Sequence, residues 1–243
     1  MVQNVGKIIL PRLIATAVSV FLAAWAVTGL ISLSASKSVR SLAAAIDAGG
    51  RATSEVLDRM SEDHSAGRLW DRCDTLTLNA RVTVGLAELD LATVTADPIR
   101  ADRASEAAEA AIRNALRCAP LDGNLWLRLA ALDTVRRGPS VRTVEFIRLS
   151  HWIAPNEGWI VRRRVDLASR LFESGVRDVQ PELRSDIRTL VNFDGPSKMA
   201  DMFLAAPQSV RPMYREWIEL LPQERKNIVT KALERRGTNL KGD

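Results

Sequence analysis

Two short stretches, "CAPLDGNLW" (Cys118–Trp126) and "IAPNEGWIV" (Ile153–Val161), follow one pattern. Each contains Ala-Pro, one variable residue, an acidic residue and Gly, and the two prolines, Pro120 and Pro155, are 35 positions apart. In both places the proline ends one helical pattern, and the polar residues after it can cap the next helix. Each stretch is therefore predicted to be the turn between one helical hairpin and the next.

The sequence around these turns predicts helices with defined caps. Apolar residues recur at three- and four-residue steps on both sides, which is the spacing of one helix face. Asp122 or Asn124 can cap the helix after the first turn, Ser140 the following one, and Asn156 the helix after the second turn. Gly138 is expected to take the left-handed conformation that ends a helix.

The remainder of the chain also has the pattern of helices. Gly49-Gly50 predicts a break in a helix that begins upstream, residues 61–67 predict a turn, and residues 69–96 predict a helix. Four further helices are predicted to open at Pro181, Ser197, Pro212 and Pro222. Because strand formers rarely alternate with polar residues anywhere, the fold class is predicted to be all-α.

A two-helix unit repeated at a period near 34 is typical of tetratricopeptide arrays. The residues that match the pattern of that family, at or beside its positions, are Trp126, Leu129, Ala130, Gly138, Phe146 and Pro155. Asp133 departs from an expected large residue, and Arg142 departs from the small residue expected where the two helices touch. Residues 100–175 thus resemble a degenerate tetratricopeptide protein. Since a stable array needs about three repeats, neighbouring helices must cap it.

Residues 13–36 form one uncharged, mostly apolar run. A bilayer core needs roughly 20 such residues in a helix, so the run predicts a transmembrane helix. Basic residues stand on both sides, which leaves the orientation open. A retained anchor with a periplasmic soluble part is the prediction, and a signal cleaved near Ser34-Ala35-Ser36 or a cytoplasmic orientation are the alternatives.

These patterns give a domain organisation in five parts. They are a short N-terminal segment (1–12), the transmembrane helix (13–36), a membrane-proximal helix and linker (37–67), tetratricopeptide-like hairpins (68–175), and a C-terminal helical cap with a frayed tail (176–243). Cys73 and Cys118 fall in different predicted helices, and the sequence leaves open whether they form a disulfide.

Charge and composition argue against a nucleic-acid binder. The net charge of +5 arises from 34 basic and 29 acidic residues that are interspersed along the chain. A nucleic-acid-binding protein would show a basic stripe or aromatic residues spaced for stacking. The densest basic runs are Arg162–Arg164 and the tail around Lys226, Lys231, Arg235 and Arg236. Both are interpreted as solvated helix surface, and contact with lipid headgroups or an anionic polymer is the alternative.

The sequence contains no set of residues with the types and spacing of a catalytic site. The chain has two histidines, and His151 directly follows Ser150, so the two side chains point about 100° apart on a helix and cannot act as a Ser–His pair. Metalloprotease, phosphate-loop, dinucleotide-binding and paired-cysteine motifs are all missing, and four zinc ligands are not available together. The sequence therefore predicts no enzyme, no cofactor and no metal. An unorthodox carboxylate enzyme would need a deep pocket with perturbed acids.

Four residues beside the second turn are the candidate partner-binding site. Trp152 and Trp159 flank the turn and Arg162 and Arg163 follow it, whereas Trp126 is predicted to be a core residue of the repeat. Helical spacing lets at most one or two residues of the arginine run face any single partner.

The predicted function is that of a non-enzymatic, membrane-anchored helical-repeat scaffold. It would bind a partner among the inner-membrane or envelope proteins of a bacterium. The anchor and the degenerate repeat resemble bacterial envelope proteins of polysaccharide assembly and export, and this resemblance implies such a pathway. The alternative is arginine-mediated binding to an anionic polysaccharide or lipid surface, which would weaken steeply as salt rises.

Overall fold

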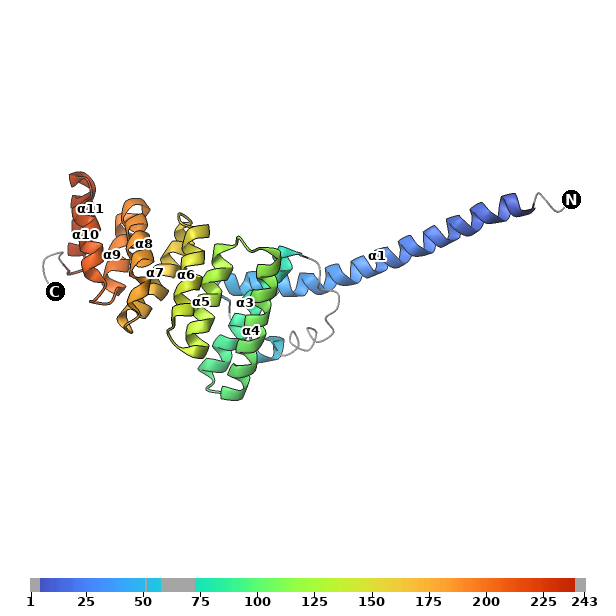
Figure 1. Ribbon diagram of the computed structural model, residues 1–243, viewed down its shortest axis with the longest axis horizontal. Coiled ribbons are helices and arrows are strands. Elements are labelled where there is room, and N and C mark those ends of the chain that lie inside the picture. The colour runs from blue at the N-terminus through green and yellow to red at the C-terminus, as the bar shows by residue number, and fades with distance from the viewer. Residues whose placement is uncertain (1–4, 51, 58–72, 239–243) are drawn as a thin grey trace. The chain divides into compact units, whose positions relative to one another are not determined.

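A computed structural model describes residues 5–50, 52–57 and 73–238 of the chain, and within its first helix the side chains of residues 17–27 and 36–47 (Figure 1). This part of the chain is helical and contains no strand, which confirms the all-α prediction. The turn predicted at residues 61–67 lies outside the described residues. The chain divides into two compact units, Met1–Ala111 (unit 1) and Ile112–Asp243 (unit 2).

Unit 1 is built on a long first helix. Its elements are α1 (Val5–Asp47), α3 (Thr75–Val94) and the first part of α4 (Pro98–Cys118). α1 packs against α3, with a small core of Val39, Ala43, Leu57, Ala80 and Val84. The break predicted after α1 is confirmed, because α1 ends at Asp47 and Gly49 has a φ of +88°. Cys73 and Cys118, whose pairing the sequence left open, are both disulfide-bonded.

The prediction of a membrane-spanning helix is wrong for the described part of the chain. No helix there is both long and apolar enough to cross a bilayer. The single-pass, inner-membrane localisation with a periplasmic soluble part is therefore not supported.

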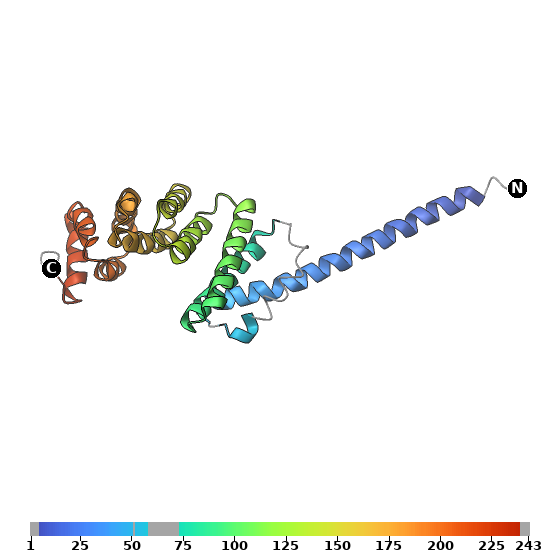
Figure 2. The same cartoon turned by 60° about the horizontal axis from the view of Figure 1, so that its bottom comes forward.

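Unit 2 is a succession of helical hairpins. Its helices are α5 (Gly123–Arg137), α6 (Val141–Ile153), α7 (Gly158–Glu173), the short η2 (Arg177–Val179), α8 (Gln180–Phe193), α9 (Pro196–Ala205), α10 (Arg211–Glu219) and α11 (Gln223–Glu234). α5 packs mainly against α6, and α7 mainly against α8; Figures 1 and 2 show these pairs following one another. The helices predicted in this part of the sequence are confirmed, with ends that differ by one or two residues.

The helices of unit 2 lie in two rows. α5 contacts α7 and α9 contacts α11 in one row, while α6 contacts α8 and α8 contacts α10 in the other. One hydrophobic core runs between the rows, from Leu127 in α5 to Leu233 in α11. The exposed residues of α11 are mainly polar, as a terminal helix that closes a stack requires.

The turns around α5 to α7 are held by side-chain and glycine caps. Asp122 caps α5, since its Oδ1 accepts hydrogen bonds from the backbone N–H groups of Asn124 (2.9 Å) and Leu125 (3.2 Å). Ser140 caps α6, and Gly138 has a φ of +78°, so these predictions are confirmed. The cap predicted at Asn156 is wrong: Glu157 holds that position, and its side chain makes no capping hydrogen bond.

The two glycines of the repeated turn have different environments. A Cβ atom at Gly123 would lie 2.6 Å from Cβ of Ala154 and 3.2 Å from the carbonyl oxygen of Ser150, because the start of α5 lies directly against the end of α6. A Cβ atom at Gly158 would meet only Nη2 of Arg162, at 3.6 Å. Gly123 is therefore required by packing, and Gly158 is not.

We predict that Gly123→Ala lowers the free energy of unfolding by about 1–3 kcal/mol, since the added methyl group forces α5 away from α6. The matched substitution Gly158→Ala should change it by less than about 1 kcal/mol, in the stabilising direction, because alanine restricts the unfolded chain. Urea unfolding followed by circular dichroism measures both. Equal effects of the two substitutions would contradict the packing constraint at Gly123.

Candidate functional site

A buried ion pair lies where α6, α7 and α8 meet. Arg164 of α7 and Asp186 of α8 are both fully buried, and two hydrogen bonds join them, from Nε to Oδ2 (2.6 Å) and from Nη2 to Oδ1 (2.8 Å). Arg164 also donates to Oγ of Ser150 at 3.1 Å and to the carbonyl oxygen of Ala154 at 3.3 Å. This one guanidinium thus connects the end of α6 to α8.

His151 belongs to the same cluster. Its Nδ1 lies 2.9 Å from Oδ1 of Asp186, and because an ionised carboxylate can only accept, Nδ1 carries the proton. The hydroxyl of Ser150 is bonded to Arg164, whereas the imidazole of His151 is bonded to Asp186. The two adjacent side chains therefore have separate partners within a structural cluster.

The turns that join successive hairpins lie on one edge of unit 2. Gly123 at the start of α5 lies against Ala154 at the end of α6. Arg162, in the second turn of α7, binds Asp194 at the end of α8, and Arg225 of α11 donates to the carbonyl oxygen of Asp194 at 2.9 Å. Helix ends far apart in the sequence thus meet on this edge.

Large apolar side chains are exposed along this same edge. We define the inter-hairpin edge as Leu121, Trp152, Trp159, Phe193 and Leu220, which flank the successive turns and are between 48% and 80% exposed. The opposite edge of unit 2 exposes two valines, Val135 and Val141, among its described large apolar residues. Exposed aromatic residues gathered at one place are typical of a protein-binding surface.

The candidate residues taken from the sequence lie at this edge. Trp152 is near the end of α6 and 75% exposed, and Trp159 is the second residue of α7 and 48% exposed. The guanidinium of Arg163 lies 5.6 Å from the ring centroid of Trp159. Arg162 is held by both oxygens of Asp194, at 2.9 and 2.6 Å, and these hydrogen bonds raise the pKa of its guanidinium.

Trp126 has a different environment from the two candidate tryptophans. It is half-buried, its Nε1–H donates to the carbonyl oxygen of Pro120 at 2.8 Å, and its ring centroid lies 5.9 Å from that of Phe146. This residue closes the joint between α5 and α6. Trp159, which follows the second turn, does not close the corresponding joint. It is one residue after Gly158, whereas Trp126 is three residues after Gly123.

Phe193 is the aromatic edge residue that the sequence analysis missed, as it also missed Leu121 and Leu220. It ends α8, is 80% exposed, and directly precedes Asp194, the residue that Arg162 binds. The signal that could have found it is a third acid-glycine pair, Asp194-Gly195, which lies 37 positions after Glu157-Gly158.

Four ion pairs connect helices of unit 2; three of them join one hairpin to the next, and the pair of Arg162 with Asp194 lies within the α7–α8 hairpin. They join Arg148 to Glu182 (3.0 Å), Arg162 to Asp194 (2.6 Å), Arg184 to Glu216, and Arg236 to Asp201 (2.7 Å). The paired residues are 32 to 35 positions apart in the sequence, which is the length of one hairpin. Much of the arginine surface is therefore neutralised within the unit.

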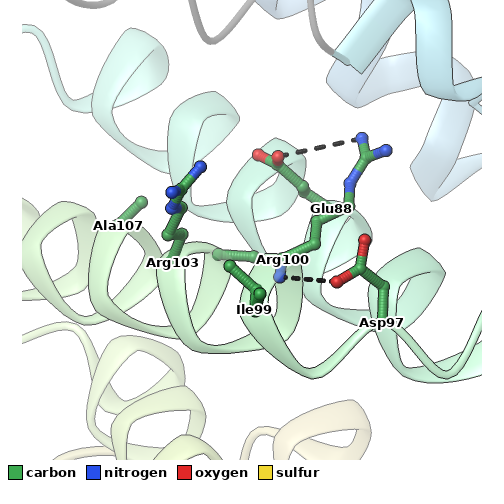
Figure 3. A pocket seen from close by; sticks show the side chains of 7 residues that line it. Glu88, Asp97, Ile99, Arg100, Arg103 and Ala107 are labelled. Atoms are coloured by element: carbon green, nitrogen blue, oxygen red, sulfur yellow. Dashed lines mark hydrogen bonds and ion pairs between the residues drawn. The ribbon is translucent and has the colours of Figure 1, made fainter.

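A pocket of about 570 Å³ lies on α3 and α4 in unit 1 (Figure 3). Its charged lining residues are Glu88, Asp97, Arg100 and Arg103. Arg100 meets Glu88 at 3.9 Å through its guanidinium, and its backbone N–H donates to Oδ1 of Asp97 at 3.0 Å. Both acids are thus engaged by Arg100, and the lining offers no arrangement of nucleophile and base.

Neither the described side chains nor known proteins point to a metal or an established family. Within the described residues, no three His, Cys, Asp or Glu side chains are grouped as metal ligands. Comparison of the chain with protein-family models, with curated proteins and with solved structures finds no match.

We predict that Arg164→Met lowers the free energy of unfolding by about 3–5 kcal/mol, because it leaves the carboxylate of Asp186 buried without its main counter-charge. The double substitution Arg164→Met with Asp186→Leu should recover at least half of this loss, since it removes both buried charges. Urea unfolding measures both variants.

The control for this prediction is Arg170→Ala. Arg170 pairs with Asp166 on the exposed face of the same helix, at 3.0 Å, and losing such a pair costs about 0–1 kcal/mol. An Arg164→Met variant no less stable than Arg170→Ala would show that the buried pair does not hold the hairpins together.

Proposed function

We propose that unit 2 is a tetratricopeptide-like scaffold that binds a partner protein through the inter-hairpin edge. The observation that carries the proposal is the gathering of Trp152, Trp159 and Phe193, all exposed, at one edge of a rigid stack. The bacterial envelope as a setting depended on the membrane span and is not part of the proposed function.

The hairpin period supports the repeat interpretation. Successive hairpins are joined by three ion pairs whose residues are 32 to 35 positions apart, close to the period of tetratricopeptide repeats. The two residues that depart from the pattern of that family also meet: Nη2 of Arg142 lies 3.4 Å from Oδ1 of buried Asp133. Besides this ion pair, Asp133 accepts hydrogen bonds from Arg137 (2.7 Å) and Thr143 (3.0 Å). A polar contact between α5 and α6 thus replaces the packing of a large side chain against a small one that the pattern of the family predicts at these two positions.

The exposed tryptophans favour a protein partner over a polyanion. Trp and Arg at the centre of an apolar patch dominate the energy of many protein–protein interfaces. Binding to an anionic polymer would need several arginines without acidic partners, whereas Arg148, Arg162, Arg184 and Arg236 each bind a carboxylate elsewhere in unit 2. Weaker binding in salt would be expected of the polymer and not of an apolar anchor.

A photo-cross-linking residue placed at position 152 or 193 of the full chain in its native cells tests the proposal. We expect one adduct of defined mass, shared by both positions, because both side chains lie in the same interface. The double substitution Trp152→Ala with Trp159→Ala should reduce the adduct at position 193 at least tenfold, the effect of removing about 1.4 kcal/mol of binding energy.

Positions 135 and 141 are the matched controls, since Val135 and Val141 are exposed on the opposite edge of the same unit. The same adduct formed with equal yield at the control positions would contradict a specific edge. Adducts that persist undiminished in the double variant would remove the tryptophans from the binding surface.

A further inference from the structure

The exposed face of α7 that carries Trp159 has one positive charge without an acidic partner in the described part of the chain. Asp166 and Arg170, further along the same face of α7, neutralise each other at 3.0 Å, and Arg162 is neutralised by Asp194. Arg163 is exposed and has no acidic partner among the described residues; its guanidinium lies over the Trp159 ring instead. The face of α7 at the edge therefore presents one aromatic ring with one positive charge.

The neighbouring start of α9 carries the same sign. Lys198, the third residue of α9, is exposed, has no acidic partner within the described part of unit 2, and lies four positions after Asp194, the residue that binds Arg162. Two exposed acids lie in the same region: Glu157 in the turn before α7, and Glu224 beside Arg225, which donates to the carbonyl oxygen of Asp194. The positive charge that contacts an aromatic ring of the edge is that of Arg163.

We propose that the inter-hairpin edge takes a linear segment of the partner protein in which acidic and apolar side chains are mixed. Apolar side chains of the segment would pack on Trp152, Trp159 and Phe193, and its carboxylates would bind Arg163 and Lys198. This inference rests on the proposed function and adds the chemistry of the partner.

The geometry of Arg163 and Trp159 favours such a segment. A cation held over an indole ring is ordered before binding, so less side-chain entropy is lost when a carboxylate arrives. The charge-assisted hydrogen bonds of Arg163 to that carboxylate would form beside the apolar contact, where the partner excludes water. A polyanion without apolar groups would leave the three aromatic side chains uncovered.

Selection from a phage-displayed library of random 12-residue peptides on the immobilised full chain tests the inference. We expect enriched peptides to contain Asp or Glu together with Leu, Phe or Trp. Their affinity, measured by fluorescence anisotropy, should fall at least tenfold with Arg163→Glu and with Trp159→Ala. Arg170→Glu, a charge reversal further along the same helix face, should change it less than twofold. Thermal melting of each variant checks that the fold is retained.

The outcomes separate the two proposals. Enriched peptides that depend on Trp159 but carry no acids, or that bind Arg163→Glu as well as the unmodified chain, overturn the acidic segment and leave the proposed function standing. No enrichment, or binding insensitive to Trp159→Ala, overturns both. Binding of heparin that competes with the peptides and is unaffected by Trp159→Ala would favour a polyanion instead, and would also overturn the acidic segment.

Discussion

The buried ion pair between Arg164 and Asp186 is the interaction on which the order of unit 2 depends. Two charges taken out of water are stabilised only if their geometry is close and their remaining hydrogen bonds are satisfied. Here one guanidinium reaches Asp186 of α8 together with Ser150 and Ala154 at the end of α6, so three helices must keep one arrangement. A shift of one helix would leave a buried charge without its partner. The pair therefore specifies how consecutive hairpins meet.

The buried ion pair between Arg164 and Asp186 also holds the inter-hairpin edge in place. Trp152 follows His151, which binds Asp186, and Trp159 is five residues before Arg164 on α7. Arg162 extends the arrangement to Asp194, beside Phe193. The exposed aromatic residues thus stand within a few residues of groups that the core fixes. Binding residues placed on turns by a rigid scaffold lose little freedom when a partner arrives.

The sequence predicted the helices of unit 2 well, because their signals are local. Proline and glycine positions, apolar spacing, and the caps Asp122 and Ser140 all act within a few residues of a helix end. The helix cap predicted at Asn156 was one residue too early, because two polar residues, Asn156 and Glu157, stand side by side before α7. The candidate site was predicted in part: the two tryptophans flank a recognised turn, whereas Phe193 ends a helix in an ordinary apolar pattern. The predicted membrane span was wrong for the described part of the chain, in which no helix is long and apolar enough to cross a bilayer.

The roles of the three arginines at positions 162 to 164 could not be predicted from their neighbours in the sequence. Arg162, Arg163 and Arg164 are adjacent and identical in type, yet one binds Asp194, one covers Trp159, and one is buried with Asp186. Helical spacing requires that they point in different directions, but the direction of each depends on residues 22 to 32 positions away, or on a neighbour one turn earlier. Two of the three positive charges are neutralised by carboxylates within unit 2. The net charge of the chain therefore overstates the positive charge that a ligand would meet at this run. The charge that remains stands beside an exposed ring, and this pairing of a cation with apolar surface favours a partner that offers both a carboxylate and an apolar side chain.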